Sequence, residues 1–247
     1  MSPGPQQFAL DIIQAPAPSL GNFIVPEKGT KDNFSLIDAL KKISNCWQAK
    51  QSIPQELSWV YFWGEVGSGR THLLKAMMSQ ASQSGLKTTY LAPNDSQAWK
   101  EIAESFDQLP QLILIDDVHA LNEIQQSILF RIQIEARTNP QIVLLITGET
   151  SVAGLKLRTD VQSRIGWGLS FEIASLSDPE KIQAINQAAQ ERGIYLASDV
   201  APWLLSNFHR DLPSLLSLIE ALDHFSLEKK RAITLPLLRE FLQSPSV

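Results

Sequence analysis

The sequence is poor in the residues that build metal sites and covalent cross-links. It has one cysteine, Cys46, and four scattered histidines among its 247 residues. One thiol cannot form a disulfide within the chain, and histidines this sparse give no cluster at the ligand spacing of a zinc site. The composition therefore excludes a disulfide framework and a zinc domain, and it fits a reducing compartment.

Long hydrophobic runs are also missing. No stretch approaches the roughly 20 apolar residues that a membrane-spanning helix needs. The first residues, MSPGPQQFALDII, lack the basic segment and long apolar core of a secretion signal. We therefore expect a cytoplasmic protein that has no membrane partner.

Basic residues are fewer than acidic ones. The chain has 21 lysines and arginines against 26 aspartates and glutamates, which gives a formal charge of −5 at pH 7. A protein of net negative charge has no general attraction for a polyanion such as DNA. We expect no strong direct DNA binding, because any such contact would require a local basic patch.

Hydrophobic residues make up 44% of the sequence, enough to form a core in a chain of this length. Residues 1–33 differ from the rest because prolines and glycines recur throughout them. That composition is typical of an extended leader. Regular structure is expected to begin near Phe34, with an amphipathic helix that continues to Lys50.

Apolar runs alternate with helical patterns between residues 34 and 177. Strands are predicted at 57–63, 88–92, 112–115, 142–147 and 168–173. Apolar residues at helical spacing predict helices between these strands. The alternation predicts an α/β domain with a five-stranded parallel sheet, flanked by helices and connected by right-handed crossovers.

The strand pattern ends at residue 177. Ser177 and Glu180 have the spacing of a capping box, which predicts a helix that ends by Gly193. Further helices are predicted at 199–208, 212–227 and 235–243. Residues 178–247 are therefore expected to form a separate, small all-α domain.

A glycine-rich segment joins the first predicted strand to a helix. It reads Gly64-Glu65-Val66-Gly67-Ser68-Gly69-Arg70-Thr71 and fits the pattern G-x-x-x-x-G-[K/R]-[S/T]. Such a loop turns backbone N–H groups toward phosphate oxygens, and the helix N-terminus adds partial positive charge. The segment is predicted to bind the phosphates of ADP or ATP, with the Thr71 hydroxyl as a ligand of Mg²⁺.

Arg70 departs from this pattern, because lysine is usual at its position. The substitution keeps the positive charge but replaces a compact ammonium group by a wide planar fork. We therefore expect nucleotide binding to be retained and fast hydrolysis to be reduced.

A pair of aspartates, Asp116 and Asp117, follows the apolar strand at 112–115. Ligands of parallel sheets bind at this carboxyl edge. Asp116 is predicted to hold Mg²⁺ through water, and Asp117 to orient an attacking water. Two aspartates after a strand are more often a solvated strand end, but their position downstream of the glycine-rich loop favours the metal site.

Four segments carry a family resemblance: FWGEVGSGRTHLLKA, LILIDDVHAL, IVLLITGE and QSRIGWGLSFEI. Together they resemble the AAA+ module of the bacterial replication initiator DnaA, from about Asn22 to the C-terminus. The resemblance implies a P-loop AAA+ sheet followed by a helical lid. It also implies that Arg164, in the most specific of the four segments, reaches into the nucleotide site of a neighbouring subunit. Taken without the resemblance, Arg164 is more typical of a surface salt bridge.

The lid departs from the family pattern. Proteins of the family place an arginine near the start of a lid helix, where it contacts the phosphates, and here Pro213 stands at that position. Arg210, three residues earlier, is the candidate replacement. Both departures, Arg70 and Pro213, predict a protein that holds a nucleotide more than it hydrolyses one.

The layout of the chain is similar to the Hda branch of the DnaA family, since the interaction and DNA-binding domains of DnaA are not found in it. In that branch an ADP-bound protein binds the DNA sliding clamp and provokes ATP hydrolysis on DnaA. The resemblance implies a negative regulator of replication initiation with those two partners. Four leader residues with the spacing of clamp-binding peptides form the candidate motif: Gln7, Phe8, Leu10 and Ile12.

Two other interpretations are open. A DNA-remodelling ATPase, such as a helicase loader or a compact initiator, would hydrolyse ATP itself and bind DNA in a salt-sensitive way. A scaffold that kept the fold without a nucleotide would do neither. The sequence is also compatible with a homo-oligomer.

Overall fold

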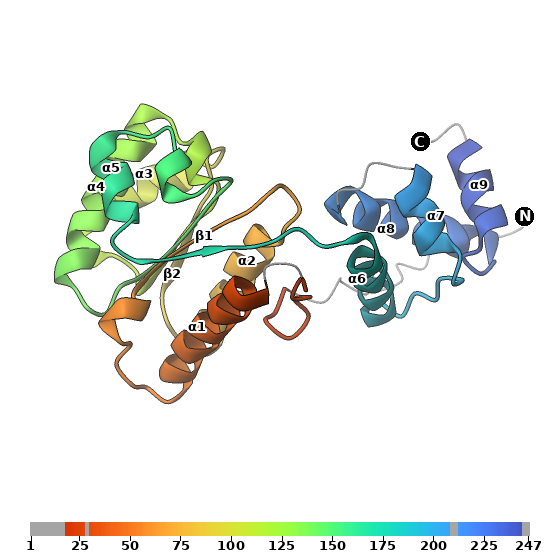
Figure 1. Ribbon diagram of the computed structural model, residues 1–247, viewed down its shortest axis with the longest axis horizontal. Helices are drawn as coiled ribbons and strands as arrows, with labels where there is room; N and C mark the ends of the chain where they lie inside the picture. The colour runs from red at the N-terminus through yellow and green to blue at the C-terminus, as the bar shows by residue number, and fades with distance from the viewer. Residues whose placement is uncertain (1–17, 28–29, 208–211, 244–247) are drawn as a thin grey trace, which may run out of the picture. The chain divides into compact units, whose positions relative to one another are not determined.

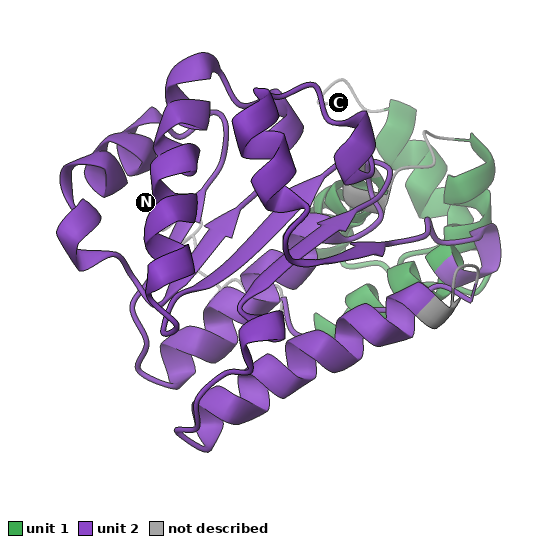
Figure 2. Cartoon of the chain, turned by 60° about the vertical axis from the view of Figure 1, so that its left-hand side comes forward, with its two compact units in different colours: residues 1–17, 181–247 green, residues 18–180 purple. Residues whose placement is uncertain are grey.

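The computed structural model describes residues 18–27, 30–207 and 212–243. The chain divides into two compact units, one that spans Pro18–Glu180 and one whose described part begins at Lys181 (Figure 2). The first unit contains the sheet, and the second contains helices.

The sheet has five strands: β1 (Trp59–Trp63), β2 (Thr88–Leu91), β3 (Leu112–Ile115), β4 (Val143–Gly148) and β5 (Leu169–Glu172). Their order is β2-β3-β4-β1-β5, and every pair of neighbours is parallel. Trp63 at the end of β1 pairs with Gly148 of β4 and Glu172 of β5, so these three strands end level. The predicted five-stranded parallel sheet is confirmed.

Helices cover both faces of the sheet. Figure 1 shows α1 (Thr30–Gln48) and α2 (Arg70–Gln83) on one face, and α3 (Ser96–Glu104), α4 (Glu123–Thr138) and α5 (Thr159–Ile165) on the other. Successive side chains of β1 join opposite cores, since Val60 and Phe62 pack in the cluster with α1 and α2, whereas Tyr61 packs in the cluster with α4 and α5. This burial on both faces explains why the strand is a continuous apolar run.

The N-terminal segment packs on the sheet unit earlier than the composition predicts. Leu20, Phe23 and Val25 are partly buried against the core cluster of α1 and α2. Helix α1 begins at Thr30, four residues before the predicted start. Asn33 lies inside this helix, where its side chain donates to the Pro26 carbonyl at 3.1 Å and accepts from the Ala174 N–H at 3.3 Å. The sequence predicts an extended leader here because prolines and glycines interrupt the hydrophobic periodicity that indicates a packed segment.

The second unit has its own hydrophobic core. Its helices are α6 (Asp178–Glu191, which begins in the first unit), α7 (Val200–Asn207), α8 (Leu212–Lys229) and α9 (Leu235–Gln243). Ile185, Leu204, Leu222 and Leu237 are buried in one cluster of this unit. The predicted helical region is therefore confirmed.

The capping box that opens α6 is only half formed. The Glu180 carboxylate accepts the Ser177 N–H at 2.6 Å, as predicted, but the Ser177 hydroxyl donates to the same carboxylate instead of accepting a backbone N–H. Glu180 also accepts the Glu27 N–H at 2.5 Å, so it joins the start of this helix to the N-terminal segment.

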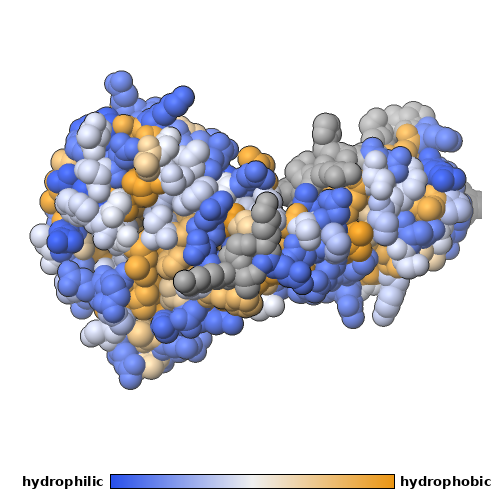
Figure 3. All heavy atoms as spheres, viewed as in Figure 1, coloured by the Kyte–Doolittle hydropathy of each residue, from blue (hydrophilic) through white to orange (hydrophobic). Residues whose placement is uncertain are grey.

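The surface mixes hydrophilic and apolar side chains. Figure 3 shows a largely hydrophilic face that small apolar areas interrupt. In the described part of the chain, no helix has the length and apolar character to cross a membrane.

Gly168, just before β5, occupies a position that has no room for a side chain. A Cβ atom there would lie 2.2 Å from the Trp59 carbonyl oxygen, which is backbone and cannot move aside. We expect Gly168→Ala to lower the free energy of unfolding by about 2 to 3 kcal/mol, the usual cost of overpacking. Urea unfolding measures this loss.

Gly166→Ala is the matched control. Its nearest neighbour would be the Ser163 carbonyl oxygen at 3.4 Å, and its φ of −71° suits any residue. A change below about 0.5 kcal/mol is expected for this variant. Equal losses for the two variants would contradict the steric explanation.

Candidate functional site

The glycine-rich loop lies at the carboxyl end of β1 and leads into α2. Gly67 and Gly69 have φ angles of 82° and 98°, in the left-handed region that favours glycine. Gly69 is the N-cap of α2, and its carbonyl accepts the Leu73 N–H at 3.0 Å. The loop therefore wraps in front of the N-terminus of a helix of 14 residues, where backbone N–H groups are available to an anion.

Two side chains of the loop are buried with unused polar atoms. Ser68 Oγ and Arg70 Nη1 are shielded from solvent and have no hydrogen-bond partner among the residues that the structure describes. Leaving such groups unpaired costs free energy. Both atoms fit a site whose partner is an anion.

Glu65 and Val66 contribute differently from the rest of the loop. The Glu65 carboxylate accepts the Ser175 hydroxyl at 2.8 Å, and the Glu65 carbonyl accepts the Ser68 N–H at 3.1 Å. Val66 is 69% exposed. Glu65 therefore stabilises the shape of the loop through its carbonyl and one surface hydrogen bond, whereas the Val66 side chain is exposed.

Arg70 forms an ion pair with Asp117. Its Nη2 lies 3.1 Å from Asp117 Oδ1, although the two atoms are not aligned as a hydrogen bond. Arg70 is buried, whereas the Asp117 side chain is about half exposed. Burial raises the pKa of the Asp117 carboxyl above its ordinary value, and the Arg70 guanidinium opposes that rise. The basic residue of the loop is thus directed at the second aspartate of the pair.

Asp116 receives hydrogen bonds from three different elements. Thr71 Oγ1 donates to Oδ2 at 2.7 Å, which joins the start of α2 to the end of β3. Tyr90 in β2 also donates to Oδ2, and Thr147 in β4 donates to Oδ1, each at 2.5 Å. The Asp117 N–H donates to Oδ1 at 3.2 Å. The structure therefore brings Thr71 and Asp116 together, as the predicted metal site requires.

Sequence reasoning missed Tyr90 and Thr147. Tyr90 lies in the predicted strand TTYLA, and Thr147 is the last residue of the predicted strand IVLLIT. Thr147 is fully buried. A hydroxyl at the carboxyl end of a buried strand was the signal available, because parallel strands bring these ends to one edge.

The N-terminal segment reaches the glycine-rich loop. A Cβ atom on Gly69 would lie 2.5 Å from Phe23 Cε2, so the Phe23 ring rests directly against the loop. The same ring lies 5.9 Å from the His72 ring, and His72 Nε2 lies 3.0 Å from the Ser19 carbonyl oxygen. Residues that the sequence assigns to a leader thus form part of the surroundings of the site.

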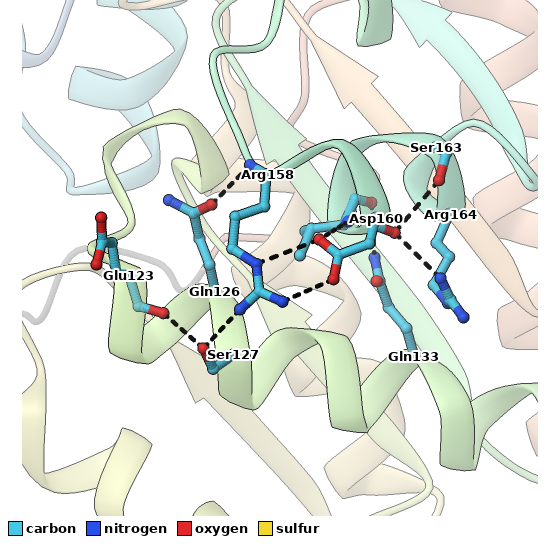
Figure 4. A network of polar contacts seen from close by, with 9 residues as sticks. Glu123, Gln126, Ser127, Gln133, Arg158, Asp160, Ser163 and Arg164 are labelled. Atoms are coloured by element: carbon cyan, nitrogen blue, oxygen red, sulfur yellow. Dashed lines mark hydrogen bonds and ion pairs between the residues drawn. The ribbon is translucent and has the colours of Figure 1, made fainter.

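Arg164 lies near the C-terminal end of α5, on an aromatic surface. Its guanidinium is 4.3 Å from the centroid of the Phe130 ring and 5.0 Å from that of Trp167. Nη1 donates to the Asp160 carbonyl at 3.2 Å (Figure 4). Arg164 Nε is buried and has no hydrogen-bond partner in the described part of the chain.

Arg158 attaches α5 to α4. Figure 4 shows its guanidinium between Asp160 and Ser127, with Nε and Nη2 donating to the Asp160 carboxylate at 3.2 and 2.6 Å and Nη1 donating to Ser127 Oγ at 2.7 Å. The Arg158 N–H also donates to Gln126 Oε1 at 2.9 Å. The hydrogen bond from Arg158 lowers the pKa of the Asp160 carboxyl below its ordinary value. Arg164 is joined to this network through the Asp160 carbonyl.

The structure does not bring Arg164 to the glycine-rich loop. The Trp167 ring beside Arg164 lies 6.3 Å from the ring of Trp59, at the start of β1. The loop follows Trp63 at the other end of that strand, and four residue steps along a strand span about 13 Å. Arg164 is consequently not part of the phosphate site of its own chain.

Five predicted residues cannot be placed. Gln7, Phe8, Leu10 and Ile12 of the candidate clamp motif, and Arg210 of the lid, lie outside the described residues.

The sheet order, the loop between β1 and α2, and the aspartates after β3 together define the P-loop fold of the AAA+ class. A family model for the bacterial DnaA ATPase domain matches residues 28–172, and one for the Hda lid domain matches residues 178–242. The chain belongs to the bacterial DnaA ATPase-domain family and carries a lid of the Hda type. The predicted relationship is thereby confirmed.

Solved structures agree with this fold. Domain III of the replication initiation protein DnaA from Thermotoga maritima is 20% identical, covers 93% of this chain and 98% of its own, and gives a TM-score of 0.71. AMPPCP-bound DnaA from Aquifex aeolicus is 23% identical over 86% of this chain and 67% of its own, with a TM-score of 0.66. The RuvB branch migration motor of Thermotoga maritima is 17% identical over 92% and 71%, with a TM-score of 0.65.

Proposed function

We propose that residues 64–71 bind the phosphates of ADP or ATP. The observation that carries the proposal is the loop itself, with Gly67 and Gly69 in the left-handed region and two buried polar atoms, Ser68 Oγ and Arg70 Nη1, unpaired in the described structure. The binding of AMPPCP by DnaA of Aquifex aeolicus, a structure of similar fold, supports it.

Thr71 and Asp116 fit a magnesium ion bound with the nucleotide. Hydroxyl and carboxylate oxygens are the ligands that Mg²⁺ prefers. The Thr71 hydroxyl donates a hydrogen bond to Asp116, so the lone pairs of the Thr71 oxygen are available to a cation. When bound, Mg²⁺ supplies positive charge that offsets the charge of the phosphates. Both residues lie at the carboxyl edge of the sheet beside the loop.

The site favours holding a nucleotide over hydrolysing it. Asp117, the candidate for orienting an attacking water, is paired with Arg70 at 3.1 Å. A carboxylate engaged by a guanidinium is a weaker acceptor for a water proton. We therefore expect the purified protein to hydrolyse ATP more slowly than about 1 s⁻¹, the low end for enzymes.

Turnover by the protein alone separates this proposal from a DNA-remodelling ATPase. The measurement is release of phosphate from ATP at saturating nucleotide, with and without single-stranded DNA. Slow release that DNA leaves unchanged is the expected result. Rapid, DNA-stimulated release would favour the remodelling ATPase instead.

The protein is further proposed to be a negative regulator of replication initiation that acts on DnaA. Its Arg164 would stabilise the charge that develops on ATP bound by the initiator, as an arginine supplied in trans does. Membership of the DnaA family, together with a lid of the Hda type, supports this. The separation of Arg164 from its own loop, by the length of β1, also supports a target on another molecule.

The DNA sliding clamp is the second proposed partner. Gln7, Phe8, Leu10 and Ile12 supply one amide and three apolar anchors within a short segment. A peptide of this kind binds by placing a few side chains in a preformed pocket. Binding to the clamp would bring the regulator to DNA that has just been replicated.

A pull-down on immobilised clamp tests the leader motif. We expect replacement of Gln7 and Leu10 by alanine to reduce clamp binding at least tenfold, a loss of about 1.4 kcal/mol. Replacement of Ile13 and Gln14 by alanine removes similar side chains outside the motif and is expected to leave binding unchanged. Undiminished binding by the first variant, or an equal loss by both, would contradict the assignment.

A further inference from the structure

The carboxylate of Asp116 has every acceptor position filled by the protein itself. A carboxylate offers about four lone pairs, two on each oxygen. Oδ2 accepts the hydroxyls of Thr71 and Tyr90 at 2.7 and 2.5 Å. Oδ1 accepts the Thr147 hydroxyl at 2.5 Å and the Asp117 N–H at 3.2 Å. A fifth donor, such as a water bound to a metal ion, would compete with these four.

Three of the four donors have a second structural task. Thr71 lies in the first turn of α2, and the Asp117 N–H belongs to the main chain. Thr147 is fully buried, and its hydroxyl also accepts the Asp117 N–H at 3.0 Å. The Tyr90 hydroxyl, by contrast, comes from the edge strand β2, and Asp116 is its hydrogen-bond acceptor.

The position of Tyr90 is fixed by the sheet. It pairs with Leu114 in the register of β2 and β3, and the Asp116 N–H donates to the Leu91 carbonyl at 3.0 Å, one residue further along. Its ring packs partly buried against the core cluster of α1 and α2. A tyrosine hydroxyl is protonated at neutral pH, so it donates to the Asp116 carboxylate. The hydroxyl therefore stays at the carboxylate.

We propose that Tyr90 is a positioning residue that competes with metal-bound water for Asp116 and so weakens the contribution of Mg²⁺ to nucleotide binding. The inference rests on the proposed nucleotide site at residues 64–71. It supplies a physical reason, separate from the pairing of Arg70 with Asp117, for a protein that holds ADP firmly and hydrolyses ATP slowly. Charge-assisted hydrogen bonds to a carboxylate are strong enough for this competition to matter.

Tyr90→Phe tests the proposal, because it removes one hydroxyl and keeps the ring in the core. The measurement is the affinity for a fluorescent ADP analogue, in buffer with EDTA and in buffer with Mg²⁺. We expect Mg²⁺ to strengthen ADP binding by the variant about five- to tenfold more than it strengthens binding by the wild type, the scale of one typical net hydrogen bond. The affinity in EDTA is expected to stay within about twofold of the wild type, because the Tyr90 hydroxyl donates to Asp116 and not to the loop.

Tyr195→Phe is the matched control. This tyrosine is 87% exposed in the helical unit, and its variant loses the same atom far along the chain. Its ratio of the affinities in Mg²⁺ and EDTA should equal that of the wild type. Thermal unfolding of the three proteins establishes that each is folded.

An unchanged ratio of the affinities in Mg²⁺ and EDTA for Tyr90→Phe would overturn the inference, because the hydroxyl would then have no effect on the contribution of Mg²⁺. A ratio shifted away from Mg²⁺ would overturn it as well, since Tyr90 would then support the metal site. In both cases binding of ADP by the wild type would leave the proposed nucleotide site intact. Failure of the wild type to bind ADP in either buffer would contradict the nucleotide site, and the inference with it.

Discussion

Replacement of Arg164 by alanine is expected to reduce the stimulated hydrolysis of initiator-bound ATP by about a thousandfold, the lower end of the range for an arginine supplied in trans. The guanidinium lies on the Phe130 and Trp167 rings, at the opposite end of β1 from its own phosphate loop. Removing it therefore deletes charge from the proposed contact with the initiator without touching the nucleotide site. The measurement is single-turnover hydrolysis of ATP bound to DnaA, with the clamp loaded on DNA.

Arg137→Ala is the control for this experiment. The Arg137 guanidinium lies 5.2 Å from the same Trp167 ring, so its loss removes one positive charge from the same surface. We expect this variant to keep most of the stimulation. Undiminished stimulation by Arg164→Ala would remove the proposed mechanism, and equal loss by the two variants would reduce the role of Arg164 to general surface charge.

Replacement of Arg70 by alanine should weaken ADP binding by about thirtyfold, which corresponds to about 2 kcal/mol for a lost hydrogen bond to a charged group. Arg70 is the buried cation of the loop, and its Nη1 has no partner in the described structure. Its loss would also leave Asp117 without its ion pair, near the phosphates of the nucleotide. Isothermal titration calorimetry with ADP measures the change.

Asp117→Asn provides the opposing variant. It removes the negative charge that faces Arg70 and keeps a side chain of similar size, so the guanidinium is free for a phosphate. We expect ADP to bind two- to fivefold more tightly, in the range of about 1 kcal/mol or less for an ion pair with one partly exposed member. Tighter binding by Arg70→Ala, or weaker binding by Asp117→Asn, would contradict the assignment of these two side chains.

Local patterns in the sequence were sufficient for the fold and for the centre of the site. The three central strands, β1, β3 and β4, are apolar runs because helices cover both faces of the sheet. The loop from Gly64 to Thr71 could be recognised because Gly67 and Gly69 adopt backbone angles that favour glycine. The position of Asp116 after a buried strand placed it at the same edge. These features depend on residues close together in the chain.

Contacts between distant segments could not be predicted in this way. The order of the strands, the ion pair of Arg70 with Asp117, and the hydroxyls of Tyr90 and Thr147 on Asp116 each join residues that are far apart in the sequence. Periodicity carries no information on such pairs. The packing of Phe23 against Gly69 was missed for another reason, because its segment has the proline and glycine content of a linker.

Amide hydrogen exchange with and without ADP tests most directly whether the loop grips the phosphates. Bound phosphate oxygens accept hydrogen bonds from backbone N–H groups and slow their exchange. We predict that ADP protects a peptide covering residues 64–71, with no protection around Arg164. An ADP titration that leaves the amides of residues 64–71 exchanging as fast as before would contradict the account at its centre.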